Sequence, residues 1–133
     1  MSAEAQEAPP ACLVYSRAYY ADIGAHVFPT EKFALTHRCL LERGWATAGD
    51  FVEPAPASDE DVLRVHTRDY VRKLKTGTLS QLEIMTLELP WSAELVRASW
   101  LCAGGTLLAC RIALRLGFAA NLAGGFHHAF PDH

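Results

Sequence analysis

The sequence predicts an α/β fold of three layers, in which helices cover a mostly parallel sheet. Two apolar runs of strand length, residues 11–15 (ACLVY) and 118–123 (FAANLA), flank a region that is rich in helix-capping residues. The second run carries no charged residue, which is typical of a strand that helices bury on both faces. A strand, several helices and a further apolar strand together indicate this class of fold.

Length and composition limit the class of protein. A chain of 133 residues is expected to form one domain. Its hydrophobic share of 50% and charged share of 20% exclude a wholly disordered or low-complexity chain. Twelve Lys and Arg residues against fifteen Asp and Glu residues give a net charge of −3. This excludes the basic surface of a dedicated nucleic-acid-binding protein, so no direct nucleic-acid partner is expected.

The first ten residues differ from the rest of the chain. They are mainly Ala, Glu and Pro and have little to bury, so we expect a disordered leader over 1–10 and a folded domain over 11–133. The leader has no basic residue and no apolar core, and is therefore not expected to be a signal peptide. No stretch approaches the roughly 18 consecutive apolar residues of a membrane span, so no membrane partner is expected.

Cysteine usage indicates the redox environment. The four cysteines lie far apart and form no CxxC pair; they are Cys12, Cys39, Cys102 and Cys110. Because no export signal is found, we expect reduced, mostly buried thiols in a cytoplasmic protein.

Charge is distributed unevenly along the chain. From Ala98 onward only three residues are charged, while three of the six histidines lie in the last seven residues. Natural domains usually end in solvated, tolerant segments. We therefore expect the chain to be a fragment of a longer domain.

The first half of the chain is expected to begin with a strand over 11–15 and a loop over 19–29. Thr30 can cap a helix that runs to about Arg43, and Gly44 can end it. The helix places its less polar side chains on one stripe: Phe33, His37, Leu40 and Leu41.

The middle of the chain contains two short predicted helices. Residues 51–56 are expected to be extended, because each proline disfavours helix in the residue before it. Ser58 to Asp61 is a capping-box pattern that opens a short helix over about 62–65. A second helix is expected over 70–75, closed by Gly77.

The longest predicted helix is capped by Ser92 and runs to about Leu116, where a glycine ends it. Pro90 prevents it from extending straight back through residues 78–91. Gly104 and Gly105 lie inside the helix, where each costs about 1 kcal/mol relative to Ala. We expect that they are kept because a Cβ there would collide with a neighbouring backbone.

The residues with chemical potential follow the last predicted strand. Ligands of α/β sheets gather outside the carboxyl ends of the strands, and Gly124 and Gly125 allow the backbone to turn and approach a ligand. His127 and His128 come next. A tandem pair of imidazoles can hold one ring neutral and one charged, which provides a proton acceptor beside an electrostatic stabiliser. Amide hydrolysis needs such a pair, because a proton is taken from water and returned to the leaving amine.

Two other interpretations of this segment are open. Adjacent histidines often lie on surface loops without a task, but here Phe126 and Phe130 flank the pair, which is unusual for a surface loop. Metal ligation by the segment's His and Asp side chains is disfavoured, because consecutive residues seldom reach one tetrahedral ion. The side chains concerned are those of His127, His128, Asp132 and His133.

The run NLAGGFHHAFPDH resembles the tandem-histidine signature of the histone deacetylase superfamily, including its bacterial and class IV-like members. Three further stretches are similar to the family in the same order. They are residues 26–33, which include Lys32 and resemble an early H-x-F-x-x-x-K/R loop, residues 65–74, which resemble a V-H-x-x-x-Y segment, and Pro90 to Ser92 with Gly104 to Thr106.

The resemblance implies zinc-dependent hydrolysis of an acetyl-amide on an arginase/deacetylase-like fold. The metal would polarise the carbonyl and lower the pKa of its water toward about 7. His128 would act as general base and acid and His127 as its electrostatic partner. Gly125 and Phe126 would shape the pocket floor, and Lys32 would attract departing acetate. For Lys32, an ordinary surface lysine at a helix start is an equally weighted alternative. Acetylated lysine, acetylated polyamines and small-molecule amides are all candidate substrates.

The family's zinc ligands, its oxyanion-stabilising Tyr and the carboxylates that orient the imidazoles lie downstream of the tandem histidines. None is expected in this chain, so the zinc ligands are expected after residue 133. The last strand would then be an unpaired apolar edge through which chains can associate. The alternative is a truncated, non-catalytic deacetylase-like module for binding or dimerisation.

Overall fold

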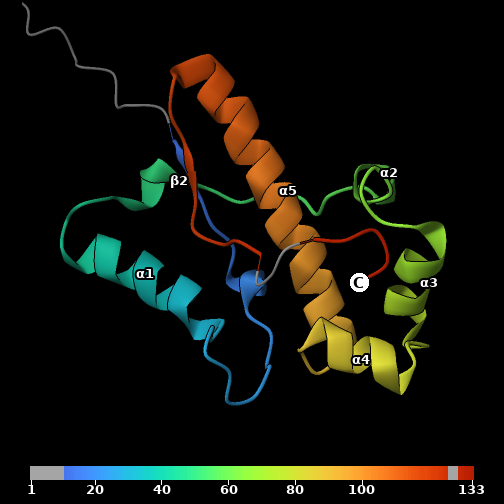
Figure 1. The fold of residues 1–133 in the computed structure, drawn as a ribbon. Helices are drawn as coiled ribbons and strands as arrows, with labels where there is room; N and C mark the ends of the chain where they lie inside the picture. The colour runs from blue at the N-terminus through green and yellow to red at the C-terminus, as the bar shows by residue number, and fades with distance from the viewer. Residues whose placement is uncertain (1–10, 126–128) are drawn as a thin grey trace, which may run out of the picture.

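The computed structural model describes residues 11–125 and 129–133. It confirms the predicted α/β class: a small parallel sheet lies between helix α1 (Glu31–Glu42) and helix α5 (Ala93–Leu116), as Figure 1 shows. Three short helices, α2 to α4, lie beyond α5 on the side away from the sheet. The fold therefore has the expected layers of helix, sheet and helix.

The sheet has three strands in the order β2-β1-β3, all parallel. The strands are β1 (Leu13–Val14), β2 (Phe51–Val52) and β3 (Ala120–Asn121). In the register of the sheet, Leu13 lies opposite Phe51 and Ala120. The first and last predicted strands are thus confirmed, and they are direct neighbours although more than a hundred residues separate them.

Helix α1 covers one face of the sheet. Phe33 is buried, and His37 stacks on the ring of Tyr15 with centroids 4.1 Å apart. The helix starts after Thr30, as predicted, but the prediction that the Thr30 side chain caps it is wrong. Thr30 already has helical backbone angles, and its side chain accepts no hydrogen bond from a helical N–H. Thr30 is buried, so its hydroxyl needs a partner, and it donates to the backbone oxygen of Ala21 at 2.6 Å.

The structure also contains two short 3₁₀ helices that the sequence did not predict. One follows β1 and the other directly precedes β2. They are η1 (Arg17–Tyr19) and η2 (Ala48–Asp50). Ser16 caps η1 by accepting the N–H of Ala18. This turn places Tyr19 in the core, where it is 1% exposed.

Two of the short helices begin earlier than predicted. Helix α2 (Asp59–Val62) starts directly after Ser58, whose hydroxyl accepts the N–H of Asp61. The prediction of a helix over 62–65 was wrong, because the capping box defines the first turn rather than a lead-in to it. Helix α3 (Arg68–Thr76) is capped by Thr67 and ends at a left-handed Gly77.

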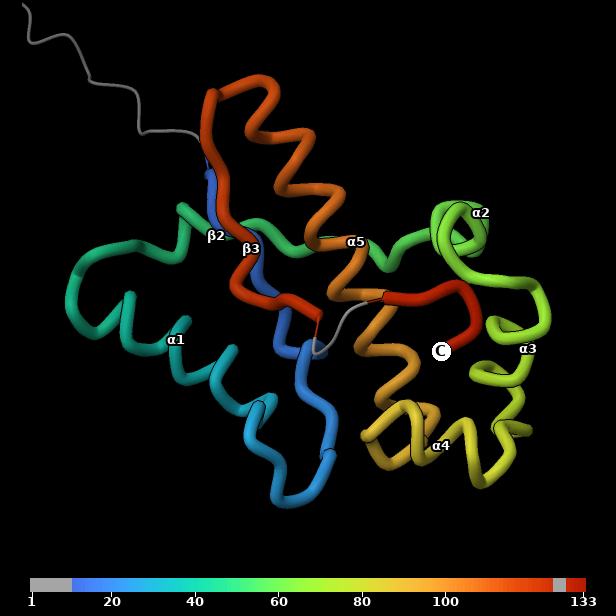
Figure 2. Tube along the Cα trace, viewed as in Figure 1, coloured from blue at the N-terminus to red at the C-terminus, as the bar shows by residue number. Residues whose placement is uncertain are grey.

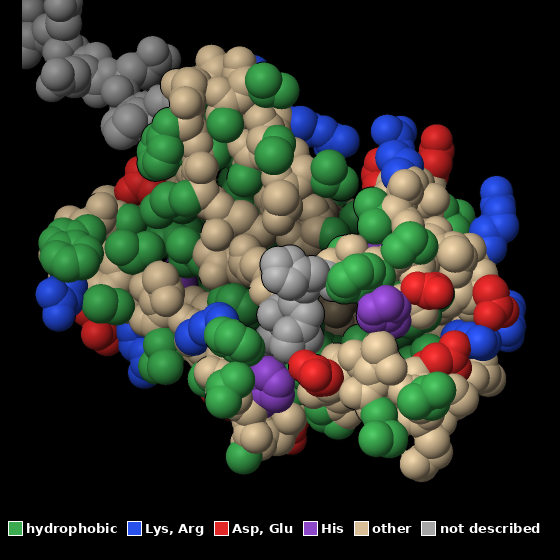
Figure 3. Space-filling view, in the orientation of Figure 1, with side chains coloured by type: hydrophobic (Ala, Val, Ile, Leu, Met, Phe, Trp, Pro, Cys, Tyr) green, Lys and Arg blue, Asp and Glu red, His purple; other side chains and the backbone are tan. Residues whose placement is uncertain are grey.

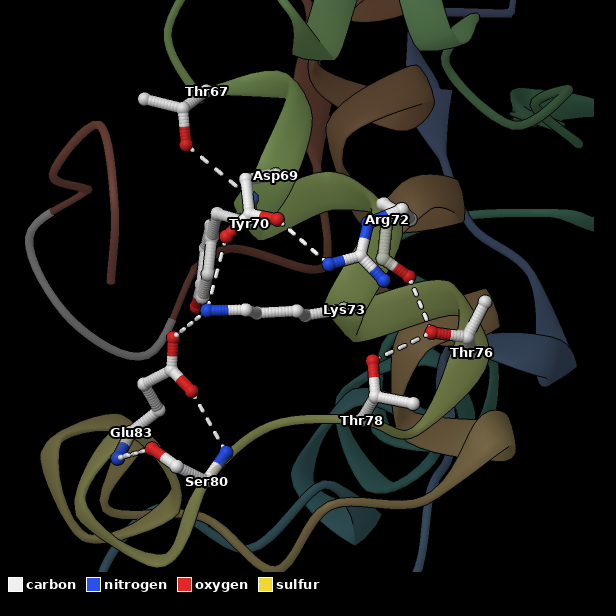
Figure 4. A network of polar contacts seen from close by, with 9 residues as sticks. All are labelled: Thr67, Asp69, Tyr70, Arg72, Lys73, Thr76, Thr78, Ser80 and Glu83. Carbon is white, nitrogen blue, oxygen red and sulfur yellow. Dashed lines mark hydrogen bonds and ion pairs between the residues drawn. The ribbon is translucent and has the colours of Figure 1, made fainter.

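Helix α4 (Gln81–Leu87) occupies the stretch that the sequence left undefined. It begins with a capping box between Ser80 and Glu83. Figure 4 shows the side chain of Lys73 reaching from α3 toward Glu83. The Lys73 ammonium lies 2.7 Å from Glu83 and 2.9 Å from Asp69, so one cation ties α3 to the first turn of α4.

Helix α5 has the predicted boundaries, with Ser92 as its N-cap and a left-handed Gly117 at its end. Among the described helices, it alone is long and apolar enough to cross a membrane by length and composition. Its buried residues, however, face the sheet and η1, as in the core helix of a globular domain. They include Leu101, Cys102 and the two internal glycines.

The predicted reason for the internal glycines, a neighbouring backbone, is confirmed for Gly104, where a Cβ would lie 2.0 Å from the backbone oxygen of Ala55. At Gly105 the neighbours are side chains instead, and a Cβ there would lie 2.1 Å from the hydroxyl of Tyr19. At Gly104 the obstacle is backbone, which cannot rotate away. The extended segment after β2 can therefore cross α5 only where the helix has no side chain.

We expect Gly104→Ala to lower the free energy of unfolding by about 2–3 kcal/mol, because overpacking against backbone outweighs the better helix propensity of Ala. Thermal or urea unfolding measures the change. Gly49→Ala is the matched control, since a Cβ there meets only the Thr47 hydroxyl at 3.8 Å, and it should change stability by less than about 0.5 kcal/mol. A stabilised Gly104→Ala protein would contradict the close contact.

The Lys73–Glu83 contact predicts a pH dependence. The Lys73 ammonium, followed by the Ser80 backbone N–H and hydroxyl, lowers the pKa of Glu83 from 4.5 to about 2. A carboxylate whose pKa is lower in the folded state stabilises the fold above its unfolded pKa and loses this effect as the pH falls toward the folded value. The melting temperature of Glu83→Gln should therefore lie below wild type at pH 7 and converge with it between pH 4.5 and pH 2. Glu60→Gln, at an exposed carboxylate outside the network, should show no such convergence.

Candidate functional site

A cavity of about 740 Å³ lies between α5 and the group of α2, α3 and α4. Its walls are mainly apolar, and the residues on either side of the tandem histidines contribute to them: Gly124, Gly125, Ala129 and Phe130. Figure 2 shows the last residues of the chain, 129–133, between α5 and the start of α3. On the face shown in Figure 3, charged side chains gather over α2 to α4. The cavity is thus a mainly apolar space beside helices whose outer surface carries charged side chains.

The chain enters this region from β3. The N–H of Leu122 donates to the Val14 oxygen at 2.9 Å and so continues the pairing of β3 with β1. The N–H of Ala123 donates to the side-chain oxygen of Asn121 at 3.3 Å. A Cβ on Gly124 would meet no atom of the described residues within 4 Å.

On the far side of the tandem histidines, the chain is attached to α3. The N–H of Thr67 donates to the Pro131 oxygen at 2.7 Å. The rings of Phe130 and His133 stack, with centroids 4.4 Å apart. The described residues before and after the tandem pair are therefore held by two different elements, β3 on one side and the start of α3 on the other.

The predicted site residues fall into two groups. His127, His128 and Phe126 lie outside the described residues, so their roles stay predictions. Gly125 lines the cavity, and its role in shaping a pocket floor stays a prediction. Lys32 does not line it: the Lys32 side chain is exposed in the first turn of α1, and its ammonium lies 5.2 Å from the ring centroid of Phe28.

Two further cavity residues were not among the predicted site residues. Tyr70 is buried, at 5% exposure, and its side chain lines the cavity. His66 lines it too, and its Nδ1 is buried without a hydrogen-bond partner among the described residues. The rings of His66 and Tyr70 lie 5.5 Å apart. His66 lies before the extended N-cap Thr67 and outside α3, so helical spacing does not predict that the two side chains meet.

The cysteines differ from the expectation of mostly buried thiols. Cys39 and Cys110 are exposed, because they lie on the outer sides of α1 and α5. Cys102 is buried and lines the cavity, and burial raises the pKa of its thiol to about 11. No three His, Cys, Asp or Glu side chains within 11–125 and 129–133 are grouped so that they could hold a metal ion.

Comparison with known proteins places this region in a family. A family model described as "Histone deacetylase domain" matches residues 26–133. An uncharacterized protein of Picosynechococcus sp. is 40% identical over 108 residues, which is 81% of this chain and 36% of the relative. Histone deacetylase 2 of Arabidopsis thaliana is 31% identical over 132 residues (90% and 34%). Acetoin utilization protein AcuC of Bacillus subtilis is 33% identical over 129 residues (88% and 33%). The chain thus spans about a third of the length of each of these relatives.

The burial of Cys102 predicts selective alkylation. At pH 8 we expect iodoacetamide to modify Cys39 and Cys110 in the native protein while Cys102 stays unmodified, because its thiolate is scarce and covered. Peptide mass spectrometry at a series of times measures the three rates. In urea all three should react alike. Native Cys102 that reacts as fast as Cys39 would show that this cavity wall is open to solvent.

Proposed function

Because the chain belongs to the histone deacetylase family, we propose that it is the N-terminal part of a zinc-dependent enzyme that hydrolyses acetyl-amide bonds. The family match over residues 26–133 carries the proposal, since it includes the tandem histidines. The structure supports it through their surroundings. Gly125 and Ala129, the described neighbours of residues 126–128, both line the apolar cavity.

In this proposal the two imidazoles divide the proton chemistry. His128 takes a proton from the attacking water and returns it to the leaving amine, as a general base and then a general acid. His127 stabilises the charge that develops beside it. Gly125 and Phe126 form the floor of the pocket. An acetyl group is small and apolar, which suits a space lined mainly by hydrocarbon.

The proposed role of Lys32 is to attract the departing acetate. Its support is the place of Lys32 in the H-x-F-x-x-x-K loop that begins at His26. The ammonium also has an ordinary structural environment, because it lies over the rings of Phe28 and Phe33. The role of this residue therefore depends on the sequence motif.

Zinc belongs to the proposal through the family. The described residues do not fit a zinc site, because they bring no three suitable side chains together. The ligands are proposed to follow residue 133 in the protein. The substrate is proposed to be an acetylated lysine, an acetylated polyamine or a small-molecule amide. The enzyme is proposed to act in the cytoplasm.

A second candidate function is a non-catalytic module for binding or dimerisation. Its support is the strand order, which leaves β3 at the edge of the described sheet. Exposed apolar side chains, Leu114 and Phe118, lie just before that strand. Such an edge can pair with a strand from another chain.

The deciding experiment is hydrolysis of an acetyl-lysine peptide by the complete protein. We expect His128→Ala to lower kcat by about 10²–10⁴-fold, because general acid–base catalysis contributes that much, while the zinc content stays unchanged. His133→Ala is the matched control and should retain both activity and zinc.

Three results would contradict parts of this assignment. Full activity of His128→Ala would remove it as the base. Zinc lost from His133→Ala would favour metal ligation by the C-terminal histidines. A wild-type protein without zinc or hydrolytic activity that forms stable dimers in light scattering would favour the non-catalytic module.

A further inference from the structure

Asn121 is the last residue of β3 and lies three residues before Gly124, the first of the two glycines. Its side-chain oxygen accepts hydrogen bonds and its side-chain nitrogen donates them. The oxygen accepts the Tyr19 hydroxyl at 2.9 Å and the backbone N–H of Ala123 at 3.3 Å. The amide nitrogen donates to the Cys102 backbone oxygen at 3.2 Å and to the Thr106 hydroxyl at 3.3 Å. One side chain thus connects η1, α5 and the chain that leads to the tandem histidines.

The surroundings of Asn121 are fixed from several sides. Tyr19 is 1% exposed and Ala123 is 8% exposed, and both belong to one core cluster with Phe33 and Cys102. Burial raises the pKa of Tyr19, so its hydroxyl stays protonated and can donate. A donor and an acceptor held in the core in this way restrict the Asn121 side chain to one orientation.

Gly105 completes the arrangement. A Cβ there would lie 2.1 Å from the Tyr19 hydroxyl and 2.8 Å from the Asn121 amide nitrogen. The hydrogen-bond network therefore occupies the space that a side chain on α5 would take. Gly105 therefore makes room for side chains of this network, whereas Gly104 makes room for the backbone of another segment.

We propose that Asn121 is a positioning residue that sets the direction of the Ala123–Gly125 backbone, and through it the placement of His127 and His128. The inference rests on the proposed function. Only a carboxamide provides what the geometry requires, since its oxygen serves Tyr19 and Ala123 while its nitrogen serves the carbonyl of Cys102. Asp would keep the acceptor toward Ala123, whereas Ala would remove every contact.

Native-state amide hydrogen exchange tests the contact directly. Leu122 provides an internal reference, because its N–H bonds to Val14 in the sheet and not to Asn121. In Asn121→Ala we expect the exchange rate of Ala123 relative to Leu122 to rise about tenfold, and in Asn121→Asp to return toward wild type. Thr106→Val removes one helix-side partner and is the control for lost stability alone. It should leave the ratio unchanged.

Side-chain NMR and kinetics test the consequence for the histidines. In the complete protein labelled with ¹⁵N-histidine, the imidazole signals of His127 and His128 should shift in Asn121→Ala but not in Thr106→Val. On an acetyl-lysine peptide, Asn121→Ala should lower kcat about tenfold to a hundredfold with KM little changed, because misplacement affects chemistry more than binding.

An unchanged Ala123-to-Leu122 ratio in Asn121→Ala, or equal imidazole shifts in Thr106→Val, would overturn the positioning role. If the wild-type protein hydrolyses no acetyl-amide, the proposed function fails instead. The exchange ratio and the imidazole signals then still decide whether Asn121 directs this part of the chain.

Discussion

The close approach of α5 to the backbone around it is the constraint on which the rest of the structure depends. At Gly104 the helix meets the segment around Ala55, and at Gly105 it meets Tyr19 and Asn121. Two adjacent positions without side chains therefore face two different neighbours. Because β1, β3 and η1 all contact α5, a shift of this helix would displace the strand end that leads into the candidate site. Close packing at one turn of α5 therefore connects the core with the end of β3, which leads into the candidate site.

Much of this architecture could be predicted, because it is encoded in short-range chemistry. Ser92 and Gly117 mark the ends of α5 through cap geometry that involves only the neighbouring turn. The same holds for Gly77 at the end of α3. Helix α4 was not predicted, although Ser80 and Glu83 form its capping box, because Pro90 and the mixed composition of residues 78–91 hid a helix of only seven residues.

The errors arose where tertiary contacts decide what a side chain does. Thr30 stands at the right position for a cap, but burial beside Ala21 gives its hydroxyl another partner. Sequence alone also cannot show that His66 faces a cavity, or that its Nδ1 has no hydrogen-bond partner among the described residues, because α5 and residues 129–133 contribute to the cavity wall. For Lys32 a motif gives one role and its contacts with Phe28 and Phe33 give another. In each case the missing information is a neighbour that is distant in the chain.

The two attachments of the chain around residues 126–128 differ in kind, and this difference has a physical consequence. Before the tandem histidines, the backbone is held by the sheet and by Asn121 within the core. After them, a hydrogen bond from the Thr67 N–H to the Pro131 oxygen joins the described residues 129–133 to the start of α3, and Phe130 stacks on His133 within that segment. Core contacts open only when large parts of a fold open, whereas exposed contacts open locally at low cost. The β3 side is therefore tied to the core of the fold, whereas the described contacts on the α3 side lie between exposed residues.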